Sequence, residues 1–292
     1  MKLAASNLML PAFDHARLLP RLTQHGVAGL EVAPFHTWPI ARDGVTGKDV
    51  RDYARMSEIA GLTIIGLHGL TEQPLDVEKL MIGAYKAKIM AQLIDLSVIC
   101  RDLGGRTMIL EARRRGALPE RSAWIVMREF LEEFLPQIEA HGTVLCLAPL
   151  TSPDGDFCTT ARECYMLTNA IDHASLGLHL GTAGLSSGGA PKHSVFAAAR
   201  GRLELFHIDE PGRALIGATG DVDHVDFRRH LVSSTYPGWV SVVQGAGPAD
   251  QHAARLAAGL TFVNATYFSK PLSDGARILE EGSRIQRHLH SH

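Results

Sequence analysis

Short apolar runs alternate along the chain with longer segments in which apolar residues recur at helical spacing. Successive runs are spaced as in βα units, in which a strand, a helix and two loops take roughly 30 residues. We therefore predict eight strands, each followed by a helix. The predicted strands cover residues 3–6, 29–33, 63–69, 106–112, 144–150, 175–182, 203–209 and 239–245.

The segments between these strands carry helix signals. Residues 129–135 read EFLEEFL and continue to Ile138, which places apolar side chains on one helical face. Gly26, Gly61 and Gly142 follow helical segments and precede strands, as expected of residues that end helices. Eight such units predict a closed parallel (β/α)₈ TIM barrel. The alternative is an open doubly wound sheet, which usually has fewer strands and often a glycine-rich phosphate loop that this sequence lacks.

Length and composition agree with one barrel domain. The chain has 292 residues, of which 46% are hydrophobic and 21% charged, as in ordinary globular proteins. Barrels of this size commonly form a single domain. We expect the barrel over residues 1–270, followed by a polar extension, 271–292, that forms a short helix and a mobile tail.

Charge and cysteine content restrict the partners and the compartment. The formal net charge of −2 argues against a nucleic-acid partner held by bulk electrostatics. No apolar run reaches the roughly 20 residues that span a bilayer. The four cysteines form no CxxC pair, so we expect a protein of the reducing cytoplasm. Cys158 and Cys164 are six residues apart and would not share a helix face, so we expect no motif there.

Charged and imidazole side chains gather where the predicted strands end. Side chains alternate between the two faces of a strand, and catalytic groups of barrels lie at the C-terminal ends of the strands. A His or Glu that ends an apolar run is uncommon unless it is paired or functional. The parity of each strand predicts a polar pocket ringed by Glu31, His68, Glu111, His179, His207, Asp209 and Gln244.

Seven segments, in order along the chain, then resemble the motifs of one family. They are 26–35 (GVAGLEVAPF), 66–70 (GLHGL), 147–150 (LAPL), 177–182 (GLHLGT), 206–211 (FHIDEP), 220–223 (GDVD) and 238–244 (GWVSVVQ). As a set they resemble the xylose-isomerase-like TIM-barrel family of sugar phosphate isomerases and epimerases, over residues 1–268. The resemblance is specific for the family and not for a substrate.

The resemblance implies a site that this chain has altered. Members of the family usually hold one divalent ion through Glu, Asp, His and Glu on the fifth to eighth strands, and the two Glu residues exchange the proton beside the sugar carbonyl. Matched motif to motif, these positions are Ala148, Gly181, His207 and Gln244. Only His207 keeps the ligand type. One imidazole and one amide would hold a hard cation poorly, and an amide cannot act as a base. We therefore expect no metal cofactor at this position.

Three hypotheses remain open. The first is an enzyme with metal-independent acid–base chemistry, an isomerisation, dehydration or cyclisation of a small sugar-like or hydroxy-carbonyl substrate. Its catalytic candidates are His207, His68, Glu111, His179 and Asp209. The second is a non-catalytic barrel that binds a sugar-like ligand or serves as a partner subunit. The third is a relocated divalent metal site built from Glu31, His68, Glu111, His179 and His207.

Further residues are candidates for binding the substrate. Arg213 follows the seventh predicted strand, where the family often places a basic residue, and it could grip a carboxylate, phosphate or hydroxyl group. Phe35 and Trp38 could wall the pocket, although local packing of their loop explains them equally well. Glu31 and Gln244 complete the substrate-binding set. The resemblance also implies a homo-oligomer.

Overall fold

The structure is a computed structural model that describes residues 1–38, 44–114, 118–150, 156–187 and 192–269. The predicted extension, 271–292, lies outside these residues. The strands are β1 (Lys2–Ser6), β2 (Gly29–Val32), β3 (Thr63–Leu67), β4 (Leu75–Asp76), β5 (Thr107–Arg113), β6 (Val144–Ala148), β7 (Leu176–Gly181), β8 (Leu203–Asp209) and β9 (Trp239–Val243). The helices are α1 (His15–Gln24), α2 (Pro34–Thr37), α3 (Gly47–Ile59), α4 (Gly83–Asp102), α5 (Glu120–Ile138), α6 (Ala161–Ile171), α7 (Thr182–Ser187), α8 (Lys192–Ala199), α9 (His224–Ser233) and α10 (His252–Val263).

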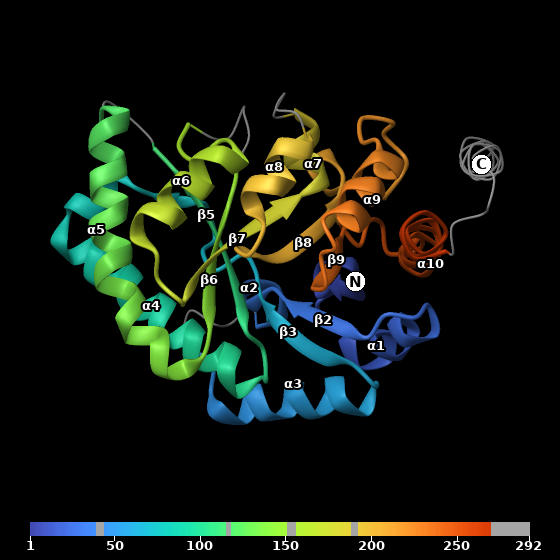
Figure 1. Cartoon of the computed structure of the whole chain (residues 1–292). Helices are drawn as coiled ribbons and strands as arrows, with labels where there is room; N and C mark the ends of the chain where they lie inside the picture. The colour runs from blue at the N-terminus through green and yellow to red at the C-terminus, as the bar shows by residue number, and fades with distance from the viewer. Residues whose placement is uncertain (39–43, 115–117, 151–155, 188–191, 270–292) are drawn as a thin grey trace.

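Eight parallel strands close into a barrel. β1 pairs with both β2 and β9, and β3 pairs with β5, so that no edge strand is left in the ring. The helices surround the strands (Figure 1). The predicted single (β/α)₈ barrel is therefore confirmed, with each of the eight predicted strands in its place. Gly26, Gly61 and Gly142 adopt the left-handed backbone expected of residues that end helices.

β4 is not among the predicted strands. Its two residues, Leu75 and Asp76, pair with Ala112 and Arg113 at the C-terminal end of β5. A strand of two residues is too short for an alternating pattern, which explains why it was missed.

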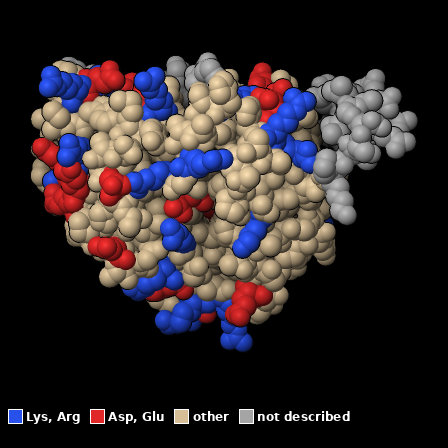
Figure 2. All heavy atoms as spheres, viewed as in Figure 1, with Lys and Arg blue, Asp and Glu red and all other residues tan. Residues whose placement is uncertain are grey.

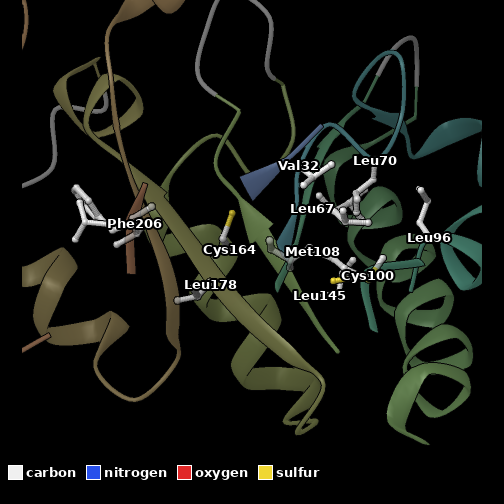
Figure 3. Packing of buried hydrophobic residues seen from close by; sticks show 14 of the residues in the cluster. Val32, Leu67, Leu70, Leu96, Cys100, Met108, Leu145, Cys164, Leu178 and Phe206 are labelled. Carbon is white, nitrogen blue, oxygen red and sulfur yellow. The ribbon is translucent and has the colours of Figure 1, made fainter. Parts of the chain in front are cut away.

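Two hydrophobic cores hold the barrel. The outer core lies between the strands and the helices; Figure 3 shows part of it, with Leu145 and Phe206 on strands, Leu96 on α4 and Cys164 on α6. The inner core fills the barrel itself and consists of Ala4, Ile65, Ile109, Val144, Cys146, Ala148, Leu205 and the partly buried Trp239. These two sets identify the face of each strand, because residues of the inner core point at the barrel axis.

Charged side chains are mixed on the surface. Figure 2 shows lysine and arginine interspersed with aspartate and glutamate across one face of the molecule, among large uncharged areas. In the part of the chain that the structure describes, no helix is long and apolar enough to cross a membrane.

Candidate active site

A buried carboxylate lies at the centre of a polar layer above the inner core. Glu31 is fully buried, and its Oε2 is 2.8 Å from Nε2 of His207 on β8. Ser241 on β9 donates its hydroxyl to the same oxygen at 2.8 Å. A buried carboxylate needs such donors, because burying it without hydrogen bonds would be costly. The structure therefore joins β2, β8 and β9 through Glu31.

The protonation state of His207 follows from its surroundings. Burial and, to a smaller extent, the positive charge of Arg213 together lower the pKa of His207 to about 3. The imidazole is thus neutral near pH 7. Because the carboxylate of Glu31 can only accept, Nε2 of His207 carries the proton, and Nδ1 keeps a lone pair.

Two further histidines adjoin His207. Nε2 of His68 is 2.7 Å from the hydroxyl of Ser6 on β1, and burial lowers the pKa of His68 to about 4. The ring of His179 on β7 is edge-on to that of His207, with 4.0 Å between the ring centroids. Burial also holds the pKa of His179 well below its usual value. All three imidazoles are therefore neutral at physiological pH.

His179 offers two hydrogen-bonding atoms. Both of its ring nitrogens are buried, and within the described residues neither has a hydrogen-bond partner. A neutral imidazole has one N–H donor and one acceptor nitrogen. His179 can therefore both donate to and accept from a substrate.

Asp209 occupies the space beside Gly181. A Cβ atom at Gly181 would lie only 3.0 Å from Oδ1 of Asp209. The same oxygen accepts hydrogen bonds from the backbone N–H of Ala183 at 2.9 Å and from the hydroxyl of Thr182 at 3.1 Å. The pKa of Asp209 is raised to about 6, because burial and the negative charge of Glu111 outweigh the lowering effect of its hydrogen bonds and of His224. Asp209 therefore titrates closer to neutrality than an ordinary aspartate.

Glu111 and Arg213 lie nearer to solvent. Glu111 shares the inward parity of Ile109 on β5 but is exposed. Arg213 ends the helical turn after β8 in a left-handed backbone conformation, with a φ of 56°. Its carbonyl accepts from the N–H of Gly245 at 2.9 Å, which ties this turn to the end of β9. Its guanidinium influences both His68 and His207.

The parity argument is wrong for Gln244. Ser241 faces the barrel axis, whereas Val240 and Val242 belong to the outer core, so Gln244 follows on the outer face. Its amide donates to the carbonyl of Arg255 on α10 at 3.0 Å and accepts from the N–H of Ile216 at 3.3 Å. The side chain is fully buried there instead of pointing into the site. A role for Gln244 in substrate binding would require a different side-chain direction.

Phe35 and Trp38 belong to the region of α2. The Trp38 ring packs edge-on against Tyr53 of α3, with 5.6 Å between the centroids, and Phe35 is partly exposed. Their part in substrate binding stays a prediction.

Two serines of the polar layer, Ser6 and Ser241, are not among the predicted site residues, which were chosen for their charged or imidazole side chains. Each serine faces the barrel axis, as does the inner-core residue two positions earlier, Ala4 for Ser6 and Trp239 for Ser241.

The positions that match the family's metal ligands do not fit a divalent cation. Ala148 is a buried part of the inner core, and Asp209 restricts the space at Gly181. His207 is bonded to Glu31, and Gln244 faces α10. Over the described ranges, no three His, Cys, Asp or Glu side chains are grouped so that they could hold a metal ion. This holds also for the five donors of the relocated-site hypothesis.

Comparison with known proteins agrees with this architecture. The family model described as "Xylose isomerase-like TIM barrel" matches residues 19–263. Curated protein sequences yield no match. Among solved structures, the chain is similar to D-psicose 3-epimerase from Clostridium cellulolyticum H10, solved with D-tagatose, at 15% identity and a TM-score of 0.72, covering 99% of each chain.

Two further structures are similar. The first is 3-keto-D-glucoside 4-epimerase from E. coli, with 14% identity, a TM-score of 0.72 and coverage of 90% of this chain and 99% of that one. The second is the IOLI protein, solved with a zinc atom, with 16% identity, a TM-score of 0.70 and coverage of 92% and 100%. At these identities the likeness is one of fold.

Proposed function

Because this chain belongs to the xylose isomerase-like TIM barrel family, we propose that it is an isomerase- or epimerase-like enzyme for a small sugar-like or hydroxy-carbonyl substrate. The reaction proceeds at the C-terminal mouth of the barrel by acid–base chemistry that needs no metal ion. An isomerisation or a dehydration beside a carbonyl group begins with loss of the carbon-bound proton, and a cyclisation begins with loss of the hydroxyl proton.

The observation that carries this proposal is the environment of Asp209. General acids and bases work best when their pKa lies near the working pH. The pKa of Asp209 is raised to about 6, whereas those of His68 and His207 fall to about 4 and 3. Asp209 is therefore the residue that takes a proton as a carboxylate and returns it as an acid.

The neutral imidazoles act as donors in this scheme. An N–H of His179 donates to the substrate carbonyl oxygen and stabilises the negative charge that develops there. A neutral imidazole can polarise a carbonyl without giving up its proton. Glu31 fixes the ring of His207 beside it, and the exposed Arg213 grips the far end of the substrate.

An isotope-exchange experiment tests the proposal. D-allulose, D-tagatose and D-fructose are incubated with the protein in D₂O containing EDTA, and deuterium beside the carbonyl group is followed by NMR. We expect exchange of at least one sugar that survives EDTA. Asp209→Asn lowers its rate by roughly 10²- to 10⁴-fold, the usual contribution of a general acid or base.

Asp221→Asn is the matched control, since it removes an exposed carboxylate outside the polar layer and leaves the rate unchanged. Exchange that EDTA abolishes, or that Asp209→Asn retains in full, would contradict the proposed chemistry.

A second candidate function is ligand binding without turnover. It is favoured by the two positions, Ala148 and Gln244, at which the family places its proton-exchanging glutamates. Calorimetric binding of one of the three sugars, without deuterium exchange in any of them, would favour this candidate over the first.

We also propose that the protein works in the cytoplasm as a homo-oligomer. The four cysteines are free thiols, and the family resemblance implies assembly. Light scattering coupled to size-exclusion chromatography tests the assembly, because a monomer mass would contradict it.

A further inference from the structure

The chain that leaves β6 brings two cysteines together at the start of α6. Cys158 precedes the helix in a left-handed backbone conformation, with a φ of 50°, and Cys164 lies within the helix. Sγ of Cys164 is 3.7 Å from the carbonyl oxygen of Cys158. The same carbonyl accepts from the N–H of Leu150 at 3.1 Å, which closes the loop after β6.

This contact corrects the expectation from spacing. Residues six positions apart lie on different faces only when both belong to one helix. Cys158 lies before the N-cap Thr160, at the point where the chain turns into the helix, so its side chain is free of that constraint. The Cys164 thiol donates to the backbone carbonyl of Cys158, and the neighbouring Cys158 side chain and burial together raise the pKa of Cys164 well above its usual value.

The other two cysteines lack such a neighbour. The thiol of Cys100 donates to the carbonyl of Thr107 at 3.7 Å, and that of Cys146 donates to the carbonyl of Val144 at 3.6 Å. Both are fully buried. In the described chain, Cys158 and Cys164 are thus the two cysteines that contact each other, through the Cys164 thiol and the Cys158 carbonyl.

We propose that Cys158 and Cys164 form a reversible disulfide when the protein meets a small-molecule disulfide such as oxidised glutathione. Cys158 retains 5% exposure and Cys164 none, so Cys158 reacts first. Its thiolate attacks one sulfur of the oxidant, the sulfur–sulfur bond of the oxidant breaks, and one glutathione leaves and takes up a proton.

The second step closes the bond within the protein. The thiolate of Cys164 attacks the mixed disulfide on Cys158 and releases the second glutathione. Two protein S–H bonds are lost, one S–S bond forms, and the oxidant is reduced to two thiols. The bond fastens the chain after β6 to α6, whose first turn is already held by the reciprocal capping bonds of Thr160 and Glu163.

Intact-mass spectrometry of the full chain tests this site. The protein is incubated with oxidised glutathione, denatured in iodoacetamide without reductant, and weighed. Before alkylation, we expect the oxidised protein to weigh two hydrogen atoms less than the reduced protein. After alkylation, two cysteines carry the label instead of four. Treatment with dithiothreitol restores all four reactive cysteines.

Tryptic mapping locates the bond. Cleavage after Arg162 separates the two cysteines, so the disulfide links two fragments that are otherwise free. Cys146 shares a fragment with Cys158, and Cys146→Ser is therefore the matched control, which must retain the linked fragments. Cys164→Ser must lose them and stop at a glutathione adduct on Cys158. Four alkylated cysteines after oxidation, or linked fragments that disappear in Cys146→Ser, would overturn the proposal.

Discussion

At the scale of single residues, the site depends on one carboxylate. Glu31 accepts from both His207 and Ser241, and this fixes which nitrogen of His207 carries its proton. The neutral state of His207 follows from burial, since water cannot stabilise a cation there. The hydrogen-bond direction, and not charge alone, therefore determines what His207 presents to a substrate.

Replacing Glu31 by Gln should reverse this direction. The amide can donate to Nε2 of His207, which moves the ring proton to Nδ1, and the free energy of unfolding falls by about 1–3 kcal/mol because the Ser241 hydrogen bond is weakened. Nitrogen NMR of the histidine rings measures the tautomer. Ser241→Ala is the control, as it removes one donor and keeps the carboxylate and the tautomer. An unchanged His207 tautomer in Glu31→Gln would refute the assignment.

At the scale of elements, β9 separates two environments. Its inward face carries Ser241 into the polar layer, while Val240, Val242 and Gln244 pack toward the helices. Gln244 fills the gap opposite Gly259 of α10, where a Cβ atom would lie 2.3 Å from its Oε1. Gln244 thus fastens α10 to the barrel.

Gln244→Glu should therefore destabilise the protein instead of restoring a metal ligand. A carboxylate cannot donate to the carbonyl of Arg255, and it would be buried without that bond. We expect a loss of about 1–3 kcal/mol in urea unfolding. Gln137→Glu makes the same chemical change at an exposed position of α5 and should cost less than about 0.5 kcal/mol. Equal stabilities of the two variants would show that Gln244 does not fasten α10.

At the scale of the whole molecule, the barrel holds several neutral histidines. Burial lowers the pKa values of His15 and His68 to about 4 and of His207 to about 3, and that of His179 lies well below its usual value. The unfolded chain would protonate these groups near pH 6.5. Between pH 6.5 and about 4 the unfolded state therefore binds more protons than the folded state.

Stability should fall as the pH falls through this range. Each histidine lowers the free energy of unfolding by up to about 1.4 kcal/mol per pH unit of acidification. Asp209, with its pKa raised to about 6, takes up a proton in the folded state below pH 6 and so offsets the effect of about one histidine. Urea unfolding at pH 8, 7, 6 and 5 should show a plateau above pH 7 and a steep loss toward pH 5. His15→Gln should reduce this slope by about one group. A constant unfolding free energy from pH 8 to pH 5 would show that these histidines are not buried in the neutral form.

Part of the site could be predicted from the chain itself. Glu31, His68, His179 and His207 end predicted strands, and the structure brings all four to one polar layer. Ser6, Ser241 and β4 were missed because a small hydroxyl or a two-residue strand leaves little local signal. Gln244 was misplaced because it follows the last residue of β9, on the outer face of the strand.

The sequence by itself determined the eight-unit barrel and the polar ends of its strands, since both follow from the spacing of apolar and polar residues within each segment. Only the tertiary structure decided which groups bond to one another. The bonds from Glu31 to His207, from Gln244 to α10 and from Cys164 to Cys158 depend on register between strands and on turns at helix starts. Those relations are set by packing between distant segments, and no local pattern encodes them.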